Sequence, residues 1–484
     1  MKNQVQLITY VDRLGGGGLE TLHQLLCGRL QGLFAGVHLL PFFHPIDGAD
    51  AGFDPIDHAR IDTRLGGWQE FRAIAQTVEV MADVIVNHVS SASHQFLHFS
   101  RHGDASLYAG LFLTLGTVFP HGATEQDLLA LYRPRPGLPF TPVTLANGER
   151  RLMWTTFTPS QIDINVGHPQ GETYLDSVLH ALAENGTKCI RLDAVGYAVK
   201  RAGTSGFMTP ETFDFIDTLS SKAHARGMEV LVEIHAPYRM QIEIARRVDW
   251  VYDFALPPLL LHALHFRTAR HLKHWIGVRP TNALTVLDTH DGIGIIDIGA
   301  DPADRSGRPG LVPPAELDRL VEAIHANCGG ESRQATGAAA SNLDLYQVNC
   351  TFFDAVGADE ERYLAARAVQ FFLPGIPQVY YVGLLAGRND MDLMRQTGVG
   401  RDINRHRFTD DEIDAALARP VVGRLLDLIR QRNTHPAFGG TFTLHPSAES
   451  VLEVSWHADG VRAGLRVDFA TGALSLAFGD EPPA

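Results

Sequence analysis

The sequence predicts an α/β protein, a (β/α)8 TIM barrel with two inserted subdomains and a small C-terminal antiparallel β domain. Three observations lead to this prediction. Up to about residue 381, eight short β-rich apolar runs alternate with amphipathic helical stretches, a pattern typical of parallel βα units. Two longer stretches interrupt this alternation. After residue 437 the pattern changes to short alternating strands.

The eight expected strands are almost continuously apolar, which suits strands that are buried on both faces. In chain order they lie at residues 5–10, 36–42, 81–88, 187–195, 228–235, 250–256, 282–290 and 378–381. The last one follows a helical stretch around ERYLAARAVQFF. Because a strand and a helix alternate eight times, we expect the strands to close into a barrel.

The interruptions divide the chain into six segments. We expect barrel parts at 1–88, 167–291 and 356–437, an inserted B subdomain at 89–166, a second inserted subdomain at 292–355 and a C-terminal β domain at 438–484. The first insertion is rich in proline and glycine and is too long for an ordinary βα connection. The second contains an amphipathic helix whose apolar face is formed by Leu317, Leu320, Val321 and Ile324.

Composition and charge exclude several classes of function. Hydrophobic residues make up 45% and charged residues 20% of the chain, and no apolar run reaches the roughly 20 residues that span a bilayer. The formal net charge of -14 opposes non-specific binding to nucleic acid. The first residues do not form a basic and apolar export signal. We therefore expect a cytoplasmic protein that binds neither nucleic acid nor membrane.

The four cysteines predict neither a metal site nor a disulfide framework. They are Cys27, Cys189, Cys328 and Cys350, they lie far apart in the sequence, and they form no CxxC pair. We interpret them as reduced thiols in the core.

Ionisable residues gather at the C-terminal ends of the expected strands, where the active sites of such barrels form. On the fourth strand Arg191 and Asp193 are two residues apart, so both side chains point to the same face. Glu233 and His235 repeat this spacing on the fifth strand. Further candidates at the same end are Asn87, His88, Asp288, His290, Asp291, Arg401 and Asp402.

Each of these residues has an ordinary structural interpretation when it is taken alone. Arg191 with Asp193 is more often a structural ion pair, and Asp50 in GADAGFD fits a turn. The joint arrangement favours chemistry, because acids, bases and arginines follow one another at the same end of successive strands. We therefore expect an active site at the barrel mouth.

Four ordered segments, DVIVNH, CIRLDAVGY, EVLVEIH and VLDTHD, are similar to the four signature regions of the α-amylase family, glycoside hydrolase family thirteen. Within this family the chain resembles the sucrose phosphorylases over nearly its whole length, through segments such as GVHLLPFF, YRPRPGLPF, GAAASNLDLYQVN and GRDINRH. The resemblance is weakest after residue 437. It implies a glucosyl transferase that converts sucrose and phosphate into α-D-glucose 1-phosphate and D-fructose, without a redox cofactor or a metal.

The resemblance also implies roles for three carboxylates. Asp193 would be the nucleophile, Glu233 the general acid and base, and Asp291 the stabiliser of the transition state. Retention of configuration requires two carboxyl groups about 5 to 5.5 Å apart, which adjacent strands can supply. We expect Arg191 to keep Asp193 ionised, and the surroundings of Glu233 to be less polar so that its pKa is raised.

The substrate contacts are likewise implied by the resemblance. Hydrogen bonds to glucose would come from Asp50, His88, His290 and Arg401, and the apolar walls from Phe53 and Phe157. Phosphate would be held by Arg135, His235 and Tyr346, and fructose by Asp344 and Gln347. A local arginine is needed because a chain of net charge -14 repels a phosphate dianion.

Several alternatives stay open at this point. A phosphorylase acting on glucosylglycerol, glucosylglycerate or sucrose 6-phosphate would share every catalytic residue, and an α-glucoside hydrolase would turn over without phosphate. A non-catalytic binding protein of the same fold is disfavoured by the intact carboxylates. A phosphate-binding barrel of aldolase type lacks a lysine at the strand ends. The sequence does not decide the oligomeric state, for which a homodimer is one option.

Calcium is not expected at the barrel mouth. Asn87 lies where some amylases bind this ion. Calcium takes about six to eight oxygen ligands, and the sequence offers no convincing set.

Overall fold

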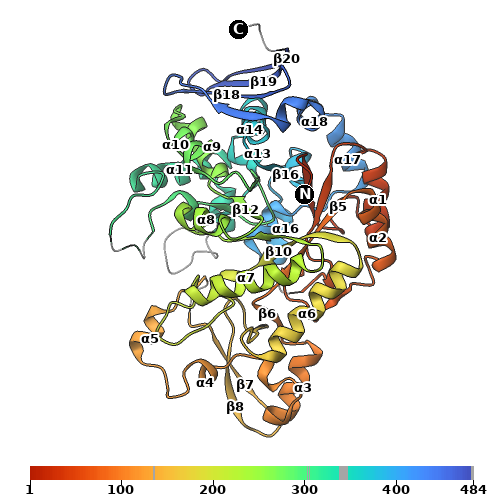
Figure 1. Cartoon of the computed structure of the whole chain (residues 1–484), viewed down its shortest axis with the longest axis vertical. Helices are drawn as coiled ribbons and strands as arrows, with labels where there is room; N and C mark the ends of the chain where they lie inside the picture. The colour runs from red at the N-terminus through yellow and green to blue at the C-terminus, as the bar shows by residue number, and fades with distance from the viewer. Residues whose placement is uncertain (49, 135–136, 302–303, 305, 337–346, 481–484) are drawn as a thin grey trace.

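The computed structural model describes residues 1–48, 50–134, 137–301, 304, 306–336 and 347–480 (Figure 1). Eight parallel strands form a closed barrel, and all eight predicted strands are confirmed. They are β1 (Gln6–Thr9), β2 (Gly36–Leu39), β5 (Glu79–Ile85), β10 (Thr187–Asp193), β11 (Glu229–Val232), β12 (Trp250–Asp253), β13 (Ala283–Thr285) and β16 (Ile376–Tyr380). The last strand pairs with the first, so the sheet has no open edge.

Several strands are shorter than predicted at their C-terminal ends. The seventh, predicted to continue to His290, ends at Thr285, and the fifth ends at Val232, just before Glu233. The polar residues beyond these ends belong to the loops that form the barrel mouth. Loops at this end can aim side chains into a shared cavity, as the last residues of the strands also do.

Helices pack around the barrel because their apolar faces cover the strands. Two of them, α6 (Pro169–Glu184) and α7 (Pro210–His224), begin with proline after the capping residues His168 and Thr209. The others around the barrel are α1 (Leu19–Cys27), α2 (Trp68–Thr77), α8 (Tyr238–Ala245), α9 (Leu256–Phe266), α10 (Arg270–Val278), α14 (Glu360–Phe372), α15 (Tyr381–Leu384), α16 (Met391–Thr397), α17 (Asp410–Leu417) and α18 (Pro420–Thr434).

The first insertion has its own secondary structure and a small apolar core, at the lower end of Figure 1. Its elements are β6 (His88–Ser90), α3 (His94–His102), α4 (Leu115–Val118), α5 (Glu125–Ala130), β7 (Phe140–Thr144), β8 (Arg150–Trp154) and β9 (Gln161–Asp163). Val118, Phe119, Leu131 and Trp154 belong to a cluster separate from the main core. A short hairpin of β3 (Phe43–His44) and β4 (Asp57–Ile61) lies nearer the barrel.

The second insertion contains the predicted amphipathic helix as α11 (Pro314–Asn327). Leu320 and Ile324 are buried, while Leu317 and Val321 are half-buried and pack against the main core. It is followed by α12 (Glu331–Thr336) and by β15 (Gln347–Val348), which pairs with β14 (Ile293–Gly294). A short helix, α13 (Phe352–Ala355), then leads to α14. The residue limits of both inserted subdomains remain predictions.

Four antiparallel strands form the C-terminal sheet, one more than predicted. They are β17 (Thr441–Leu444), β18 (Val451–Ala458), β19 (Val461–Asp468) and β20 (Ala473–Asp480). The missed strand β20 alternates half-buried Leu474, Leu476 and Phe478 with small residues, a period of two that is typical of a half-buried strand.

The cysteines require one correction. Cys189, Cys328 and Cys350 are buried free thiols, as predicted, but Cys27 is exposed and does not belong to the core. It is the last residue of α1, whose buried face is formed by leucines. Within the described residues, no helix combines the length and the apolarity that crossing a membrane requires.

Candidate active site

A cavity at the C-terminal ends of the barrel strands collects most of the predicted site residues. Its lining includes Asp50, Phe53, His88, Phe157, Asp193, Glu233, His235, His290, Asp291, Gln347 and Arg401. Arg191 lies directly behind this lining and is 1% exposed. Arg135, Asp344 and Tyr346 lie outside the described residues.

The Arg191 guanidinium contacts both Asp193, the expected nucleophile, and Glu233, the expected acid and base. Its Nη1 lies 3.0 Å from Asp193 Oδ1, and its Nη2 lies 3.2 Å from Glu233 Oε1. The same Nη1 also donates to Asp83, which stands opposite Arg191 in the register of β5 and β10. One rigid guanidinium therefore holds Asp193 and Glu233 close to one another in the wall of the cavity.

The pKa of Asp193 differs from the expectation. Burial, Glu233, Asp83 and Asp291 raise this pKa well above its usual range, although Arg191 lowers it. Arg191 acts on Asp193 in the predicted direction, but burial and the neighbouring carboxylates outweigh its effect on the pKa. The reason is that one guanidinium is shared by three carboxylates and cannot neutralise all of them.

Asp291 has the opposite electrostatic environment. It accepts a hydrogen bond from Arg401, and His290 Nε2 and Arg405 Nη2 lie 3.7 and 4.0 Å from its carboxylate. Burial raises its pKa, but His290, Arg401, His235 and Arg405 together hold the pKa well below the usual range. Asp291 is therefore a permanent negative charge in the cavity, suited to facing a positive charge that develops during a reaction.

His235 is oriented by a carboxylate from the second insertion. Asp297 Oδ2 accepts from His235 Nδ1 at 2.9 Å, and Asp297 Oδ1 accepts from the backbone N–H of Ala236 at 3.1 Å. Burial lowers the pKa of His235, but Asp297, together with Glu233 and Asp291, outweighs burial and the pKa is raised. Gly294 permits this approach, since a Cβ there would lie 1.9 Å from Asp297 Oδ2.

Two pairs of rings in the cavity wall meet in stacked and edge-on contacts. The Phe53 ring stacks on His290 with centroids 4.8 Å apart, and the Phe157 ring meets His88 edge-on at 5.4 Å. Burial lowers the pKa of His88, and it lowers that of His290 to about 3, so both imidazoles are neutral. A neutral imidazole can donate one hydrogen bond and accept another, which matches sugar hydroxyls.

Sequence analysis missed several contributors to the cavity. Gln161, Tyr197 and Phe207 also line it, and Asp83 and Asp297 support Arg191 and His235. Asp83 could have been found, since it is a carboxylate inside an apolar strand. Ala194, directly after Asp193, has a φ of 54°, a strained conformation that the sequence does not reveal.

Asp288 does not join the site. It was expected among the ionisable residues at the mouth, but its carboxylate turns toward α14 and lies 2.8 Å from Arg367 Nη2. Both side chains are buried, so this is a structural ion pair.

Two groups of residues at the mouth have the chemistry to hold a cation. Glu233, His235 and Asp291 have ligand atoms within 4.8 Å of one another. The second group, Asn87 and Asp163, already contacts an ammonium, because Lys200 Nζ lies 2.8 Å from Asn87 Oδ1 and 2.8 Å from Asp163 Oδ2. Lys200 thus supplies positive charge next to the residue that was considered for calcium.

Known proteins of similar sequence cover almost the whole chain. It is 59% identical to a sucrose phosphorylase of Agrobacterium vitis, over 98% of this chain and 97% of that protein. It is 53% identical to a sucrose phosphorylase of Bifidobacterium adolescentis, over 99% and 96%. The chain belongs to the sucrose phosphorylase family. A glucosylglycerol phosphorylase of Marinobacter adhaerens is a more distant member of the same group, 38% identical over 99% of this chain and 97% of its own.

Solved structures agree with this family and its barrel. The structure of a sucrose 6F-phosphate phosphorylase from Thermoanaerobacter thermosaccharolyticum matches with a TM-score of 0.90 and 36% identity, over 99% of this chain and 96% of that chain. An α-amylase from H. orenii shares the fold, with a TM-score of 0.68 and 15% identity over 97% and 90%. No protein-family model matches the chain.

Proposed function

We propose that the protein is a sucrose phosphorylase, a hexosyltransferase that moves glucose from sucrose to inorganic phosphate with retention of configuration. The observation that carries the chemistry is the bridge formed by Arg191, which lies within 3.2 Å of both Asp193 and Glu233. A double displacement requires two carboxyl groups about 5 to 5.5 Å apart that flank the bond to be broken, and Arg191 holds these two close to one another.

In the first step an Asp193 oxygen attacks the anomeric carbon of glucose. The bond from this carbon to the fructose oxygen breaks, and Glu233 gives its proton to that oxygen. Fructose leaves, and glucose remains as an ester of Asp193. Asp291, held ionised by its cationic neighbours, faces the positive charge that develops on the sugar ring.

The raised pKa of Asp193 affects where a proton resides before sugar binds. We infer that a proton on Asp193 is favoured when no sugar is bound, because burial and the neighbouring carboxylates raise the pKa of this residue. Binding of sucrose then requires this proton to reside on Glu233, next to the leaving oxygen. Asp193 is released as the anion that attacks.

In the second step phosphate takes the place of fructose. A phosphate oxygen attacks the anomeric carbon, its proton passes to Glu233, and the ester bond to Asp193 breaks. Glucose 1-phosphate leaves, and the original charges are restored. Two inversions at one carbon give the α anomer.

Cationic groups are needed to bring a dianion beside these carboxylates. His235 suits this role because Asp297 raises its pKa and so favours the imidazolium, and its Nε2 lies 3.9 Å from Glu233 Oε1. We assign further phosphate contacts to Arg135 and Tyr346, and fructose contacts to Asp344 and Gln347. Gln347 supports this assignment, since it lines the cavity.

Sucrose is favoured over the other glucosides by similarity. The two sucrose phosphorylases share more than half of their residues with this chain, whereas the glucosylglycerol phosphorylase shares 38%. We further propose that the enzyme acts in the cytoplasm, without a metal or redox cofactor, and that a homodimer is its first candidate assembly.

One assay tests this function. The purified protein is incubated with sucrose, with and without phosphate, and glucose 1-phosphate and glucose are quantified. We expect α-glucose 1-phosphate by proton NMR, formed only with phosphate and faster than free glucose. A β-phosphate product would contradict the double displacement. Faster turnover of glucosylglycerol, glucosylglycerate or sucrose 6-phosphate would reassign the substrate.

A further inference from the structure

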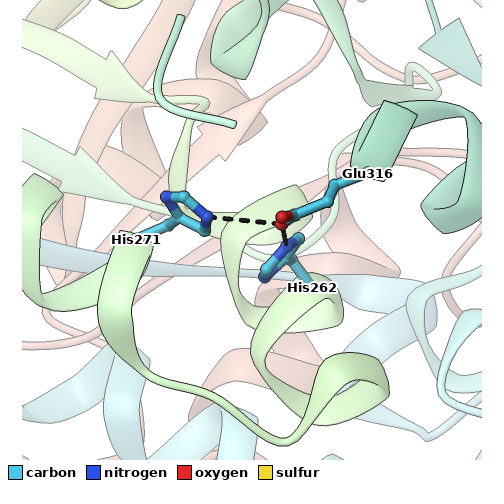
Figure 2. A group of neighbouring side chains, drawn as sticks. All are labelled: His262, His271 and Glu316. Carbon is cyan, nitrogen blue, oxygen red and sulfur yellow. Dashed lines mark hydrogen bonds and ion pairs between the residues drawn. The ribbon is translucent and has the colours of Figure 1, made fainter. Parts of the chain in front are cut away.

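A second group of ligand-type side chains lies outside the active site. His262 on α9, His271 on α10 and Glu316 on α11 converge where these three helices meet (Figure 2). None of them lines the catalytic cavity. The mechanism proposed above uses none of them.

The three side chains point to one spot. Glu316 Oε2 lies 2.8 Å from His262 Nε2 and 3.3 Å from His271 Nε2, and all three atoms lie within 4.8 Å of one another. A tetrahedral ion with bonds of about 2.0 to 2.2 Å needs ligand atoms roughly 3.3 to 3.5 Å apart. The Glu316 and His271 atoms already lie at this separation, the Glu316 and His262 atoms lie about 0.5 Å too close, and the two histidine nitrogens are at most about 1.4 Å too far apart.

One nitrogen in this cluster has competing neighbours. His271 Nε2 lies 3.3 Å from Glu316 Oε2, which can only accept, and 3.3 Å from Arg270 Nη2, which can only donate. A neutral imidazole nitrogen satisfies one of these partners and not both. A bound cation would take the lone pair of His271 Nε2. Glu316 would then bind the same cation as His271.

The position also differs from a solvated surface cluster. The side chain of His262 is 1% exposed and that of His271 is 11% exposed, while Glu316 is 28% exposed. Two ligands are thus held by packing, the Phe266 ring lying 4.5 Å from the His262 ring. The third opens toward solvent, where an ion could enter and keep a water molecule as its fourth ligand.

We propose that His262, His271 and Glu316 form a binding site for a divalent transition-metal ion, with Zn²⁺ as the best match. Two imidazole nitrogens and one carboxylate oxygen are a ligand set that zinc accepts, and they are too few and too nitrogen-rich for calcium or magnesium. The ion would join α11 of the second insertion to α9 and α10 of the barrel.

This position gives the site a structural consequence. From α11 the chain continues through α12 to β15, where Gln347 lines the catalytic cavity. An ion that binds only the folded state stabilises it by mass action. Zn²⁺ should therefore hold α11 against α9 and α10 and raise the melting temperature of the protein. It should take no part in the chemical steps.

The test measures Zn²⁺ binding by calorimetry, Co²⁺ binding by its visible absorption, and the melting temperature with and without Zn²⁺, all on the metal-stripped full chain. We expect one ion per chain at this site and a melting temperature raised by a few degrees. His271→Gln and Glu316→Gln should weaken Zn²⁺ binding more than about 10-fold, since loss of a direct ligand exceeds the effect of losing an outer contact.

Matched controls separate this site from others. His274→Gln on α10 and His265→Gln on α9 replace exposed histidines of the same helices and should change nothing. Glu233→Gln disrupts the other cation-capable group and should leave this binding intact. The proposal fails if His271→Gln and Glu316→Gln bind Zn²⁺ as tightly as the parent. It also fails if the parent binds no Zn²⁺, or if Glu233→Gln abolishes the binding seen in the parent.

Discussion

A single buried guanidinium, Arg191, is shared by Asp83, Asp193 and Glu233. This sharing fixes the carboxylates, but it leaves excess negative charge in a place with little water. The active site is therefore destabilised by its own functional groups, a cost that a nucleophile held ready for attack entails.

Asp193→Asn tests both the stability cost of this carboxylate and its role in catalysis. Because the pKa of Asp193 is raised in the folded state, the folded state holds more protons than the unfolded state above pH 4. The free energy of unfolding therefore falls as pH rises through that range. The amide has no such proton. We expect the variant to melt about 2 °C higher or more at pH 7, with a smaller gain near pH 4, and to lose glucosyl transfer more than about 10³-fold.

Calorimetry at two pH values and rate assays check this prediction. A melting temperature at pH 7 below that of the parent would mean that Asp193 stabilises the fold. Mass spectrometry of a trapped glucosyl-enzyme should locate the sugar on Asp193. A label on Glu233 would reverse the two roles.

Glu233→Gln separates proton donation from attack. Cleavage of sucrose should slow about 10²- to 10⁴-fold, because the departing oxygen is no longer protonated. Glucosyl fluoride needs no such proton, so its rate should fall much less. Asp291→Asn is the matched control, since it removes charge stabilisation and should slow both donors alike. Equal losses for the two donors in Glu233→Gln would rule out Glu233 as the acid.

Asp297 acts through His235 and so is a positioning residue. In Asp297→Asn the pKa of His235 should fall, because the carboxylate that stabilises the imidazolium is lost. In the parent, kcat/KM for phosphate should decline as pH rises through the raised pKa of His235. In the variant this decline should begin at lower pH, with little change in kcat/KM for sucrose. An unchanged phosphate profile would exclude His235 from the phosphate site.

At the scale of elements, the eight strands could be predicted because each is an apolar run between turn signals. Their ends could not, since Asn87, Glu233 and His290 continue the strand pattern in sequence but lie in loops. Side-chain direction was also hidden. Asp288 turns to Arg367, and Asp297 meets His235 across 62 positions, contacts that no local spacing encodes.

The prediction for phosphate, the acceptor of glucose, concerns Arg135. Arg135→Ala should weaken apparent phosphate affinity and divert the glucosyl intermediate to water, because a dianion beside Asp193 and Glu233 needs a local guanidinium. Formation of the intermediate from sucrose should change less. Phosphorolysis and hydrolysis are measured on one preparation, and an unchanged ratio would show that Arg135 does not serve phosphate.

For the whole molecule, stability and chemistry reside at opposite ends of the barrel. Phe372 lies just before β16, and therefore at the N-terminal end of the strands, away from the mouth. The C-terminal sheet attaches here, since the Trp456 indole N–H donates to the Phe372 carbonyl at 2.6 Å. Figure 1 shows this sheet at the top and the first insertion at the bottom.

Trp456→Ala should therefore destabilise the protein without changing its kinetics. Trp456 is 7% exposed and packs against Phe438 and Phe442, so truncation should cost about 3–5 kcal/mol. Trp456→Phe keeps most of the packing and removes the hydrogen bond, which should cost about 1 kcal/mol. Thermal unfolding gives this order, while kcat and KM for sucrose and phosphate, measured well below the melting temperature, should match the parent. A changed KM with an unchanged melting temperature would mean that the sheet communicates with the mouth, although Trp456 lies 165 residues along the chain from Asp291.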